Sequence, residues 1–370
     1  IQSAGRNELS YQFTHMLIRD YIYSKMSSLR QTMIHQRIAA YLEQKMSLDH
    51  KARDLYSEVL YHYAKARQKL KVLEYTTKLA ERFSSPHYEM YPVVNDDAQT
   101  GAGSSITDRL QITNYLREIG SLLASLPQET TDEEPISRYK AAYLEMLGRY
   151  RIWRGEHVAG LKVIHELLRL AAAKEYDDYL LKGYQQVAYC GIETGRQKLV
   201  AAFAGKLLHT ASEHNLKEKI AIAFRLRGFA RAMQRDYGLA EQDYRQSISL
   251  FRRLSNQSGK YAVSIGAAYS YIGNIRSSQG KFAEALQYYE KAITLYNGQN
   301  TGEALVVICT NAGAMAFELE DYEKVDTYFA KALRVSEQFG GQTGFWCSRS
   351  LCILKAFSSL VAVRQDNPLV

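Results

Sequence analysis

Residues 269–296 read YSYIGNIRSSQGKFAEALQYYEKAITLY, and their apolar residues recur with the period of a helix on both sides of one break. Tyr269, Ile272 and Ile275 form the apolar stripe of a first helix, and Gly280 interrupts the pattern. The second stripe comprises Phe282, Ala285, Leu286, Tyr289, Ala292 and Ile293. The stretch therefore predicts two helices that form a hairpin.

Small residues decide how closely the two helices of this hairpin can approach each other. Gly273 in the first helix and Ala285 in the second leave the backbones free to pack, and Tyr289 and Ala292 close the far side against the next hairpin. This order of a small residue, a turn glycine, aromatic residues and alanines resembles the tetratricopeptide repeat. The resemblance implies a stack of similar hairpins.

The same pattern recurs along the chain from residue 136 onward. The small residues of the first helices align as Gly148, Ala188, Gly228, Gly273 and Gly313. The turns are expected at Gly155, Gly195, Arg235, Gly280 and Glu320. The period is about forty residues with one longer interval, against about thirty-four in the usual tetratricopeptide repeat. We therefore predict an all-α fold, a right-handed superhelical solenoid of antiparallel helix pairs.

The composition agrees with a helical solenoid, and the sequence also indicates where in the cell the protein is located. The chain of 370 residues has 5 Pro and 28 Tyr, which suits hairpins that pack rings against small residues and disfavours a turn-rich β fold. No apolar run has the length of a membrane span, and the N-terminus lacks the pattern of a signal peptide. We expect a cytoplasmic protein that does not contact membranes.

Charge and cysteine usage give few functional signals. The formal net charge is +8, and residues 1–82 supply most of it. The charge does not form a stripe along the repeats and no helix-turn-helix is visible, so direct binding of nucleic acid is not expected. The cysteines show no C-x-x-C spacing and are interpreted as buried reduced thiols: Cys190, Cys309, Cys347 and Cys352.

The N-terminal segment carries a second resemblance. Residues 8–45 predict an extended start and two helices, with Ser27 and Ser28 as N-cap candidates. The first apolar face is Phe13, Met16, Leu17, Tyr21 and Ile22, and the second is Met33, Ile34, Ile38, Ala39 and Leu42. The order Phe13-x-His15-x-Leu17-Ile18-Arg19-Asp20-x-Ile22-Tyr23, followed by Arg30, His35, Ile38-Ala39 and Leu42-Glu43, carries the resemblance.

This segment looks like the one that closes the winged-helix-like end of the ATPase module in large bacterial signal-transduction NTPases. They include the large LuxR-type activators, the ATPase-containing SARP-type activators and cyclase- or kinase-linked relatives. The resemblance implies that residues 1–50 end a winged-helix-like segment and contact an upstream ATPase domain. The start without Met suggests a piece of a longer chain.

The remaining organisation follows from breaks in the helical pattern. Residues 51–126 are expected to form irregular hairpins with a loop at 84–107, and residues 136–340 the regular repeats. Residues 341–370 would be a capping helix or a truncated repeat. In the hairpin at 56–83, the expected inward residues are Tyr61, Ala64, Leu73, Tyr75, Leu79 and Ala80.

No catalytic or metal-binding motif is present. The sequence has no phosphate loop, no G-x-G-x-x-G after a strand, no H-E-x-x-H and no G-x-S-x-G. His15 and His35 lie near the N-terminal helices without a third ligand at a telling spacing, which favours a packing or hydrogen-bonding role. We therefore expect no enzymatic activity, no cofactor and no metal.

The candidate site is the groove that stacked first helices line in a solenoid. Counting from the small residues gives the groove candidates Glu145, Arg149, Trp153, Gln185, Tyr189, Arg225, Phe229 and Asn274. Arginines beside aromatic rings could hold a peptide carboxylate or a polar small molecule. Alternatively, the rings fill the inner bend and the arginines pair with Glu145 and Glu193. Ser270, Asn274 and Ser277 present few anchors, so residues 136–235 are the favoured binding region.

The functional expectation is a ligand- or protein-sensing module of a multidomain bacterial regulator, in which a signal-transduction ATPase controls transcription. A protein, peptide or small-molecule effector in the groove would shift an equilibrium between two states. The alternative is a peptide-binding scaffold that does not switch.

Overall fold

The computed structural model describes residues 2–3, 11–12, 15–48, 55–83, 106–127, 133–255, 261–296, 302–337 and 345–366. These residues are helical apart from connections and two short strands, β1 (Gln2–Ser3) and β2 (Tyr11–Gln12), which pair antiparallel. The chain divides into two compact units: unit 1 comprises residues 1–80 and 117–139, and unit 2 comprises residues 81–116 and 140–370. Each unit is described by itself below.

Unit 1 is a small group of helices around a core of aliphatic and aromatic side chains. Its helices are α1 (Met16–Lys25), α2 (Ser28–Leu48), α3 (Tyr56–Lys65), most of α4 (Lys69–Phe83) and the C-terminal part of α5 (Ile106–Ala124). The backbone N–H of Arg30 donates to Ser27 Oγ, which confirms Ser27 as a cap of α2. The core contains Ala39, Leu42, Val59, Tyr63, Val72 and Tyr75.

A carboxylate ties α2 to α3 and α4 beside this core. Glu43 accepts hydrogen bonds from the hydroxyls of Tyr63 and Tyr75 at 2.5 and 2.7 Å and from Lys71 Nζ at 2.8 Å. Burial acts to raise the pKa of Glu43, but the bonds from Lys71, Tyr63 and Tyr75 outweigh it and lower the pKa overall. The network therefore favours the ionised carboxylate.

Two expectations about unit 1 were wrong. No residue of α1 is buried, and the side chains of Leu17 and Met16 are 82% and 69% exposed, because no described element packs over the predicted apolar face. In α3, Val59 and Tyr63 point inward, whereas Tyr61 and Ala64 are exposed. Leu73, Tyr75, Leu79 and Ala80 of α4 are buried as predicted.

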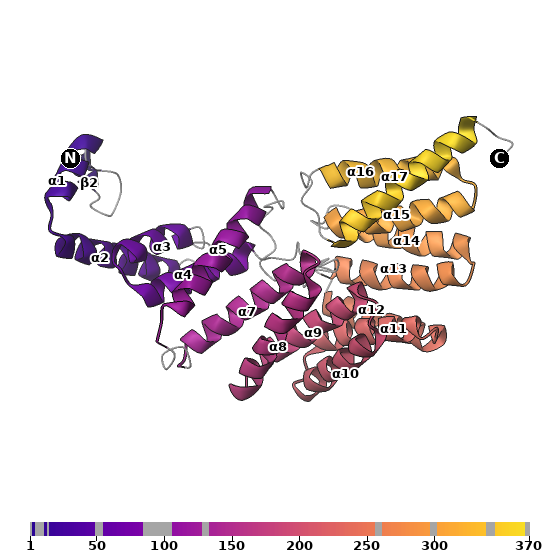
Figure 1. Cartoon of the computed structure of the whole chain (residues 1–370), viewed down its shortest axis with the longest axis horizontal. Coiled ribbons are helices and arrows are strands. Elements are labelled where there is room, and N and C mark those ends of the chain that lie inside the picture. Colours follow the sequence, from indigo (N-terminus) through magenta and orange to yellow (C-terminus); the bar gives the residue numbers. More distant parts are fainter. Residues whose placement is uncertain are drawn as a thin grey trace. The chain divides into compact units, whose positions relative to one another are not determined.

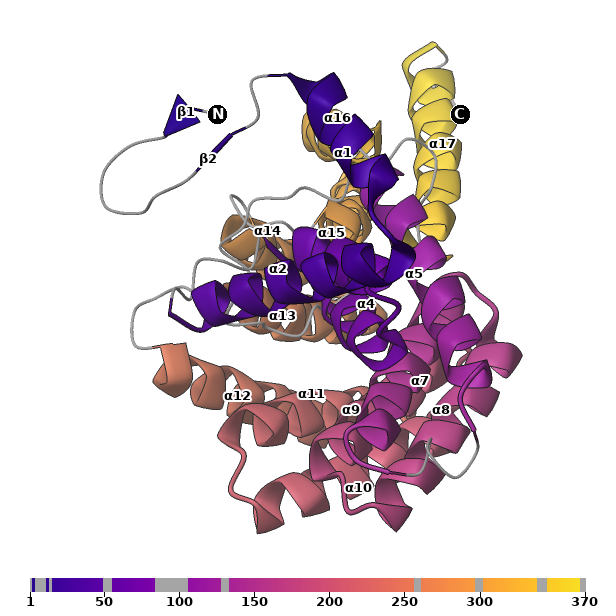
Figure 2. The same cartoon turned by 90° about the vertical axis from the view of Figure 1, so that its left-hand side faces the viewer.

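Unit 2 is a solenoid of antiparallel helix pairs (Figures 1 and 2). We call α7 (Ile136–Trp153), α9 (Asp177–Glu193), α11 (Lys217–Met233), α13 (Ala262–Ser278) and α15 (Gly302–Glu318) the first helices. The second helices are α8 (His157–Ala173), α10 (Gln197–Glu213), α12 (Tyr237–Ser255), α14 (Phe282–Tyr296) and α16 (Tyr322–Glu337). The helix α17 (Phe345–Asp366) packs on α15 and α16.

Left-handed backbone conformations mark the turn inside every hairpin. The φ angles are 81° at Gly155, 67° at Gly195, 63° at Arg235, 73° at Gly280 and 60° at Glu320. These are the five positions predicted from the repeat, so the turn register is confirmed. The left-handed residue ends the first helix and reverses the chain.

Close approach to an aromatic ring explains the glycine of the first helix in three of the hairpins. A Cβ atom built on Gly273 would lie 2.8 Å from Cε1 of Tyr289, and one on Gly313 would lie 2.4 Å from Cε1 of Phe329. At Gly228 the atom would lie 2.8 Å from the ring of Tyr244. An aromatic side chain of the second helix thus fills the space that the missing side chain leaves.

The other boundaries agree with the sequence in part. The helix α5 lies within residues 51–126, which were expected to form irregular hairpins, and α17 lies within residues 341–370, which were expected to form a capping helix or a truncated repeat. Most of the predicted loop, residues 84–105, lies outside the described residues. Cys190 and Cys309 are buried, but Cys352 is exposed, because α17 presents it outward; the side chain of Cys347 lies outside the described residues.

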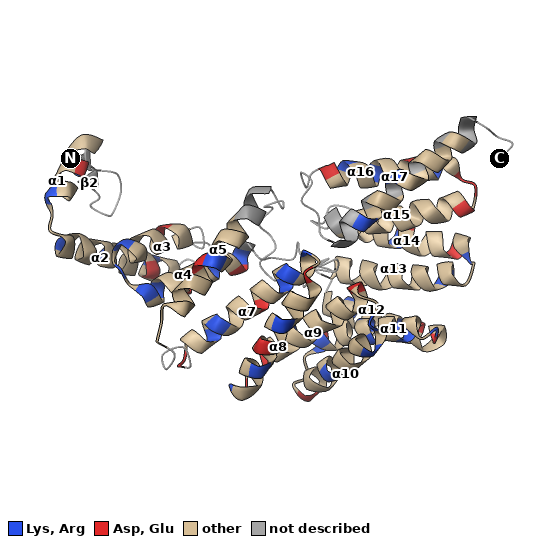
Figure 3. Cartoon of the chain, viewed as in Figure 1, with Lys and Arg blue, Asp and Glu red and all other residues tan. Residues whose placement is uncertain are grey.

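The described helices can be checked for membrane spans and for the distribution of charge. None of them combines the length and the apolar character that crossing a bilayer requires. In unit 2, Lys and Arg are interspersed with Asp and Glu along the helices (Figure 3).

Candidate functional site

The first helices of unit 2 are buried on more sides than the second helices. In α9 and α13 buried residues occupy most positions, whereas α10 buries the single stripe Val200, Ala204, Leu207 and Ala211. The reason is that a first helix contacts several neighbours: α11 packs against α9, α10, α12 and α13. Polar side chains on these helices therefore lie in a confined environment.

A row of buried polar side chains follows the first helices. The residue three positions before the small residue is polar in all five hairpins: Glu145, Gln185, Arg225, Ser270 and Thr310. Their exposed fractions are 6%, 1%, 1%, 2% and 2%. Burying a polar group is costly unless it finds partners. Ser270 and Thr310 donate to carbonyls of their own helices, Ala267 and Val306, but the other three residues use side-chain partners.

Arg225 lies at the centre of the most connected part of this row. Its Nη2 donates to the hydroxyl of Tyr189 on α9 at 3.0 Å, and its Nη1 donates to the carbonyl of Ser264 on α13 at 3.4 Å. Gln185 donates to the same Tyr189 hydroxyl at 3.3 Å and accepts from Lys219 Nζ at 3.4 Å. We call Gln185, Tyr189, Lys219, Arg225 and Ser264 the Arg225 cluster.

Two hydrogen bonds of the Arg225 cluster are long. Two of its bonds, from Arg225 to Ser264 and from Lys219 to Gln185, measure 3.4 Å, well beyond the usual 2.9–3.0 Å for N–H···O. Guanidinium and ammonium groups make shorter and stronger bonds to carboxylates than to neutral oxygens. A carboxylate or a peptide carbonyl could therefore replace these long contacts.

A hydroxyl–carboxylate bond reinforces the same side of α11. Tyr261, which precedes α13, donates from its hydroxyl to Glu218 Oε2 at 2.9 Å. Burial, followed by the hydrogen bond to Glu218, raises the pKa of Tyr261 to about 12, so the hydroxyl keeps its proton and stays a donor. Three consecutive first helices are thus connected by side chains.

The other predicted residues do not join this cluster through direct bonds among the described contacts. On α7, Arg149 pairs with Glu145 at 3.4 Å, as the alternative interpretation expected, and Trp153 lies 6.0 Å from the Tyr150 ring. Phe229 packs edge-on against Tyr271, with ring centroids 5.0 Å apart, and Asn274 accepts a 2.6 Å bond from the Tyr289 hydroxyl. Their role in binding stays a prediction.

The prediction from the sequence did not include two members of the Arg225 cluster. Lys219 lies near the start of α11, outside the positions counted from the small residue. Ser264 contributes a backbone carbonyl, which no residue type reveals. Only the helical register of Lys219, about two turns before Leu226, could have placed it near the cluster.

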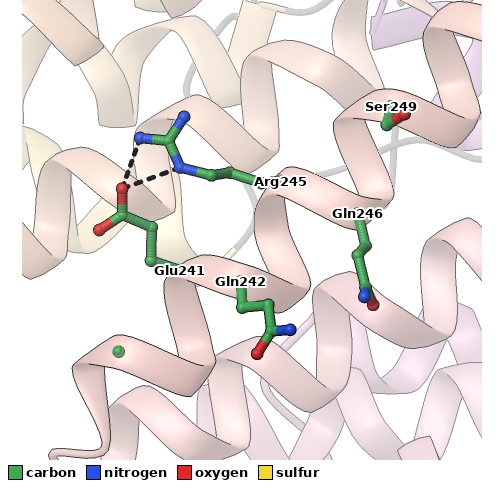
Figure 4. Close-up of a pocket in the computed structure, with 6 residues that line it drawn as sticks. Glu241, Gln242, Arg245, Gln246 and Ser249 are labelled. Carbon is green, nitrogen blue, oxygen red and sulfur yellow. Dashed lines mark hydrogen bonds and ion pairs between the residues drawn. The ribbon is translucent and has the colours of Figure 1, made fainter.

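A shallow hollow lies on the outer side of α12 (Figure 4). It measures about 470 Å³ and is lined by Gly238, Glu241, Gln242, Arg245, Gln246 and Ser249. Glu241 is engaged by Arg245 and Arg276, whose hydrogen bonds lower its pKa although burial acts to raise it. All lining residues belong to one helix, so the hollow lacks the convergent groups of the Arg225 cluster.

Metal binding finds no support in the described ranges. Within them, no three His, Cys, Asp or Glu side chains converge in a way that could hold an ion.

Comparisons with known proteins agree on the repeat fold. Residues 264–338 match the family model described as Tetratricopeptide repeat. No curated protein sequence matches the chain.

Solved structures resemble the chain over most of its length. A Rap protein complexed with Competence and Sporulation Factor superposes with a TM-score of 0.57 at 13% identity, covering 91% of this chain and 87% of that chain. NprR in complex with its cognate peptide NprX gives a TM-score of 0.55 at 14% identity, with 90% and 84% covered. The apo form of the quorum sensor NprR from B. thuringiensis gives 0.50 at 13% identity, with 95% and 83% covered. At these identities the likeness shows a shared fold, a solenoid of tetratricopeptide type.

Proposed function

We propose that unit 2 binds a peptide segment along the face of its first helices, with the Arg225 cluster as the anchor. The observation that carries this proposal is the row of buried polar side chains on the first helices. Its member Arg225 is 1% exposed and is hydrogen-bonded to both neighbouring first helices, α9 and α13. A helix-packing role alone would be served by apolar side chains of similar size.

The chemistry of the anchor suggests what part of a peptide it takes. Arg225 and Lys219 bring two cationic groups to one face, and Tyr189 adds a hydroxyl that both donates and accepts. A carboxylate, either an acidic side chain or a chain terminus, would form charge-assisted bonds there. Phe229 and Trp153 would supply flat apolar surface farther along the groove.

The structural neighbours support the proposal as analogues. Two of them, the Rap protein and NprR, were solved with a peptide or signalling factor bound. Their fold is shared with this chain, whereas their residues and ligands are not carried over.

We further propose that the chain is the sensing module of a multidomain bacterial regulator, a signal-transduction ATPase that controls transcription. The resemblance of residues 8–45 suggests an upstream ATPase domain as the intramolecular partner. The exposed apolar side chains of α1 support docking, because a helix that is apolar around most of its circumference normally lies within a protein core. Ligand binding would act by its differential affinity for two docked states.

A binding experiment tests the anchor. Peptides selected from a displayed library on the wild-type chain would be measured by calorimetry against Arg225→Lys and Tyr189→Phe, with Arg245→Ala on the outer face of α12 as the control. We expect a loss of about tenfold or more in affinity for both cluster variants, or ~1.4 kcal/mol, and none for the control. Equal affinity in all four proteins would refute the assignment.

The same peptides distinguish a switch from a scaffold. Hydrogen exchange of α1 and α2, measured with and without a bound peptide, reports whether peptide binding by unit 2 is coupled to the state of these two helices. A change in exchange there supports the sensor. Unchanged exchange, with peptide bound to unit 2, favours the alternative, a peptide-binding scaffold without a switching role.

A further inference from the structure

Two histidines form the junction between α1, α2 and α3 in unit 1. His35 on α2 is 6% exposed, and its Nδ1 lies 2.7 Å from Nδ1 of His62 on α3. On its other side, Nε2 of His35 lies 2.9 Å from the hydroxyl of Tyr23 on α1. One side chain from each helix thus joins a single chain of hydrogen bonds.

Proton counting limits the states that this junction can adopt. A separation of 2.7 Å between the two Nδ1 atoms is a hydrogen-bond distance, so one hydrogen lies between them. With both rings neutral, either ring can donate that hydrogen, and Tyr23 adjusts its hydroxyl accordingly. A single added proton is also accommodated, because a charged His35 can donate to both His62 and Tyr23. A second added proton places two N–H groups face to face.

The surroundings oppose protonation. His35 faces Tyr23 of α1 and Tyr61, His62 and Lys65 of α3, while Glu58 of α3 is the carboxylate that acts on His62. Burial, then His62 and Lys65, lowers the pKa of His35. Burial lowers the pKa of His62 although Glu58 acts to raise it. The packed junction therefore favours neutral rings.

The attachment of α1 depends on this junction. Among the described residues, two side-chain hydrogen bonds hold α1 to α2: the Tyr23–His35 bond and a 2.8 Å bond from Gln31 Nε2 to the carbonyl of Tyr23. No residue of α1 is buried, so apolar packing adds little. Displacing the His35 ring removes one of the two bonds and the ring contact of Tyr23, whose centroid lies 5.7 Å from that of His35.

We propose that His35 and His62 form a proton-sensitive junction, in which double protonation separates the two rings and releases α1 from α2 and α3. The proposal concerns residues 15–66 alone and does not rest on peptide binding by unit 2. Mild acidification would therefore free α1, whose apolar side chains are exposed, to move away from α2 and α3.

The direction with pH follows from the two lowered pKa values. An unfolded or released histidine binds its proton near pH 6.5, whereas the packed pair binds its protons at lower pH. The released state therefore holds more protons between these limits. The stability of the junction is fully present above about pH 6.5 and is lost as the pH falls below it.

Hydrogen exchange on the full chain tests this inference. Protection of the α1 amides would be followed from about pH 7.5 to about pH 5, with the chemical exchange rate corrected for. In the wild type we expect protection to fall below pH 6.5 by about tenfold per pH unit for each proton taken up on opening, with uptake of two protons as the upper limit. Protection that stays constant over this range would overturn the proposal.

Variants assign the effect to the pair. His62→Asn keeps a donor and an acceptor at the contact but cannot be charged, so its α1 protection should lose the pH dependence. His165→Asn, at an exposed histidine of α8, is the matched control and should keep it. Tyr23→Phe should leave α1 weakly protected at every pH. A pH dependence that persists unchanged in His62→Asn or in Tyr23→Phe would contradict the mechanism.

Discussion

At the scale of single residues, the fold of unit 2 depends on where a side chain is missing. Gly273 has the ring of Tyr289 in the place of its own Cβ, and the equivalent contact recurs in neighbouring hairpins. Gly205, on the outer side of α10, has open space there instead. Glycine therefore has different roles at these two positions.

These two glycines provide a matched pair of substitutions. Gly273→Ala should destabilise unit 2 by about 1–3 kcal/mol, because the added methyl group must displace an aromatic ring in a packed core. Gly205→Ala should stabilise it by up to ~1 kcal/mol, since alanine is the better helix former and meets no neighbour. Urea unfolding followed by circular dichroism measures both changes. A stabilised Gly273→Ala protein would show that the Tyr289 ring can move freely.

The Arg225 cluster shows at the same scale what the sequence could tell about the site. The register of the repeat placed Gln185, Tyr189 and Arg225 on the inner helices, and the structure brings these three side chains together. The sequence could not show that Arg225 is nearly inaccessible to solvent, because its burial depends on how closely α9 and α13 approach α11. Whether the cluster binds a ligand stays a prediction.

At the scale of secondary-structure elements, the turns inside the hairpins are fixed by backbone conformation more than by residue type. Glycine occupies the left-handed position in three hairpins, but Arg235 and Glu320 occupy it in the other two. A left-handed φ costs a residue with a Cβ about 1–2 kcal/mol. Glycine avoids this cost, but it loses more conformational entropy on folding, which offsets part of the advantage.

Exchanging residue types at the turns tests this cost. Arg235→Gly should stabilise the α11–α12 hairpin by about 0.5–1 kcal/mol, and the reverse exchange, Gly280→Ala, should destabilise the α13–α14 hairpin by a similar amount. A Cβ at Gly280 meets no atom within 4 Å, so its effect is purely conformational. Thermal unfolding of both variants measures the difference. A lower melting temperature for Arg235→Gly would point to an unrecognised side-chain contribution.

A buried carboxylate ties α11 to α12. Asp243 is 1% exposed and accepts bonds from Arg227 Nη2 at 2.7 Å, Arg227 Nε at 3.0 Å and Arg231 Nη1 at 2.8 Å. Both arginines remain partly exposed, so water can solvate them if the carboxylate charge is removed. The net contribution is thus smaller than for a fully buried ion pair.

Neutralising this carboxylate should loosen the hairpin. Asp243→Asn is expected to cost about 1–3 kcal/mol, because an amide presents a donor where two arginines donate. Glu284→Gln is the control: its partner Arg276 lies at 2.8 Å, but Glu284 is half exposed, and a cost within ~0.5 kcal/mol is expected. Hydrogen exchange in α11 and α12 locates the effect. Equal costs for the two variants would contradict the role of burial.

The elements also show why some sequence predictions were wrong. Turn positions follow from local periodicity, and all five hairpin turns were confirmed. Which face of a helix is buried depends on its neighbours. The apolar residues of α1 found no described element to cover them, and in α3 Tyr63 points inward where Tyr61 had been expected.

At the scale of the whole molecule, the chain has two units with separate buried clusters. Val59 lies in the cluster of unit 1, together with Tyr63 and Tyr75, and Asp243 lies beside the cluster of unit 2 that contains Tyr244. In a repeat protein, stability is a sum of terms between nearest neighbours, so a perturbation spreads only as far as its contacts. Two substitutions in different units should therefore act independently.

A double-mutant cycle tests this independence. Val59→Ala should cost about 2 kcal/mol through the cavity it leaves, and this cost should appear in the hydrogen exchange of α2, α3 and α4. Combined with Asp243→Asn, its effect should add within ~0.5 kcal/mol, because the two residues share no partner. Arg227→Gln combined with Asp243→Asn is the contrasting case and should fall short of additivity, since either substitution alone already breaks the same bonds. Coupling between Val59 and Asp243 as strong as that between Arg227 and Asp243 would contradict the independence of the two sites.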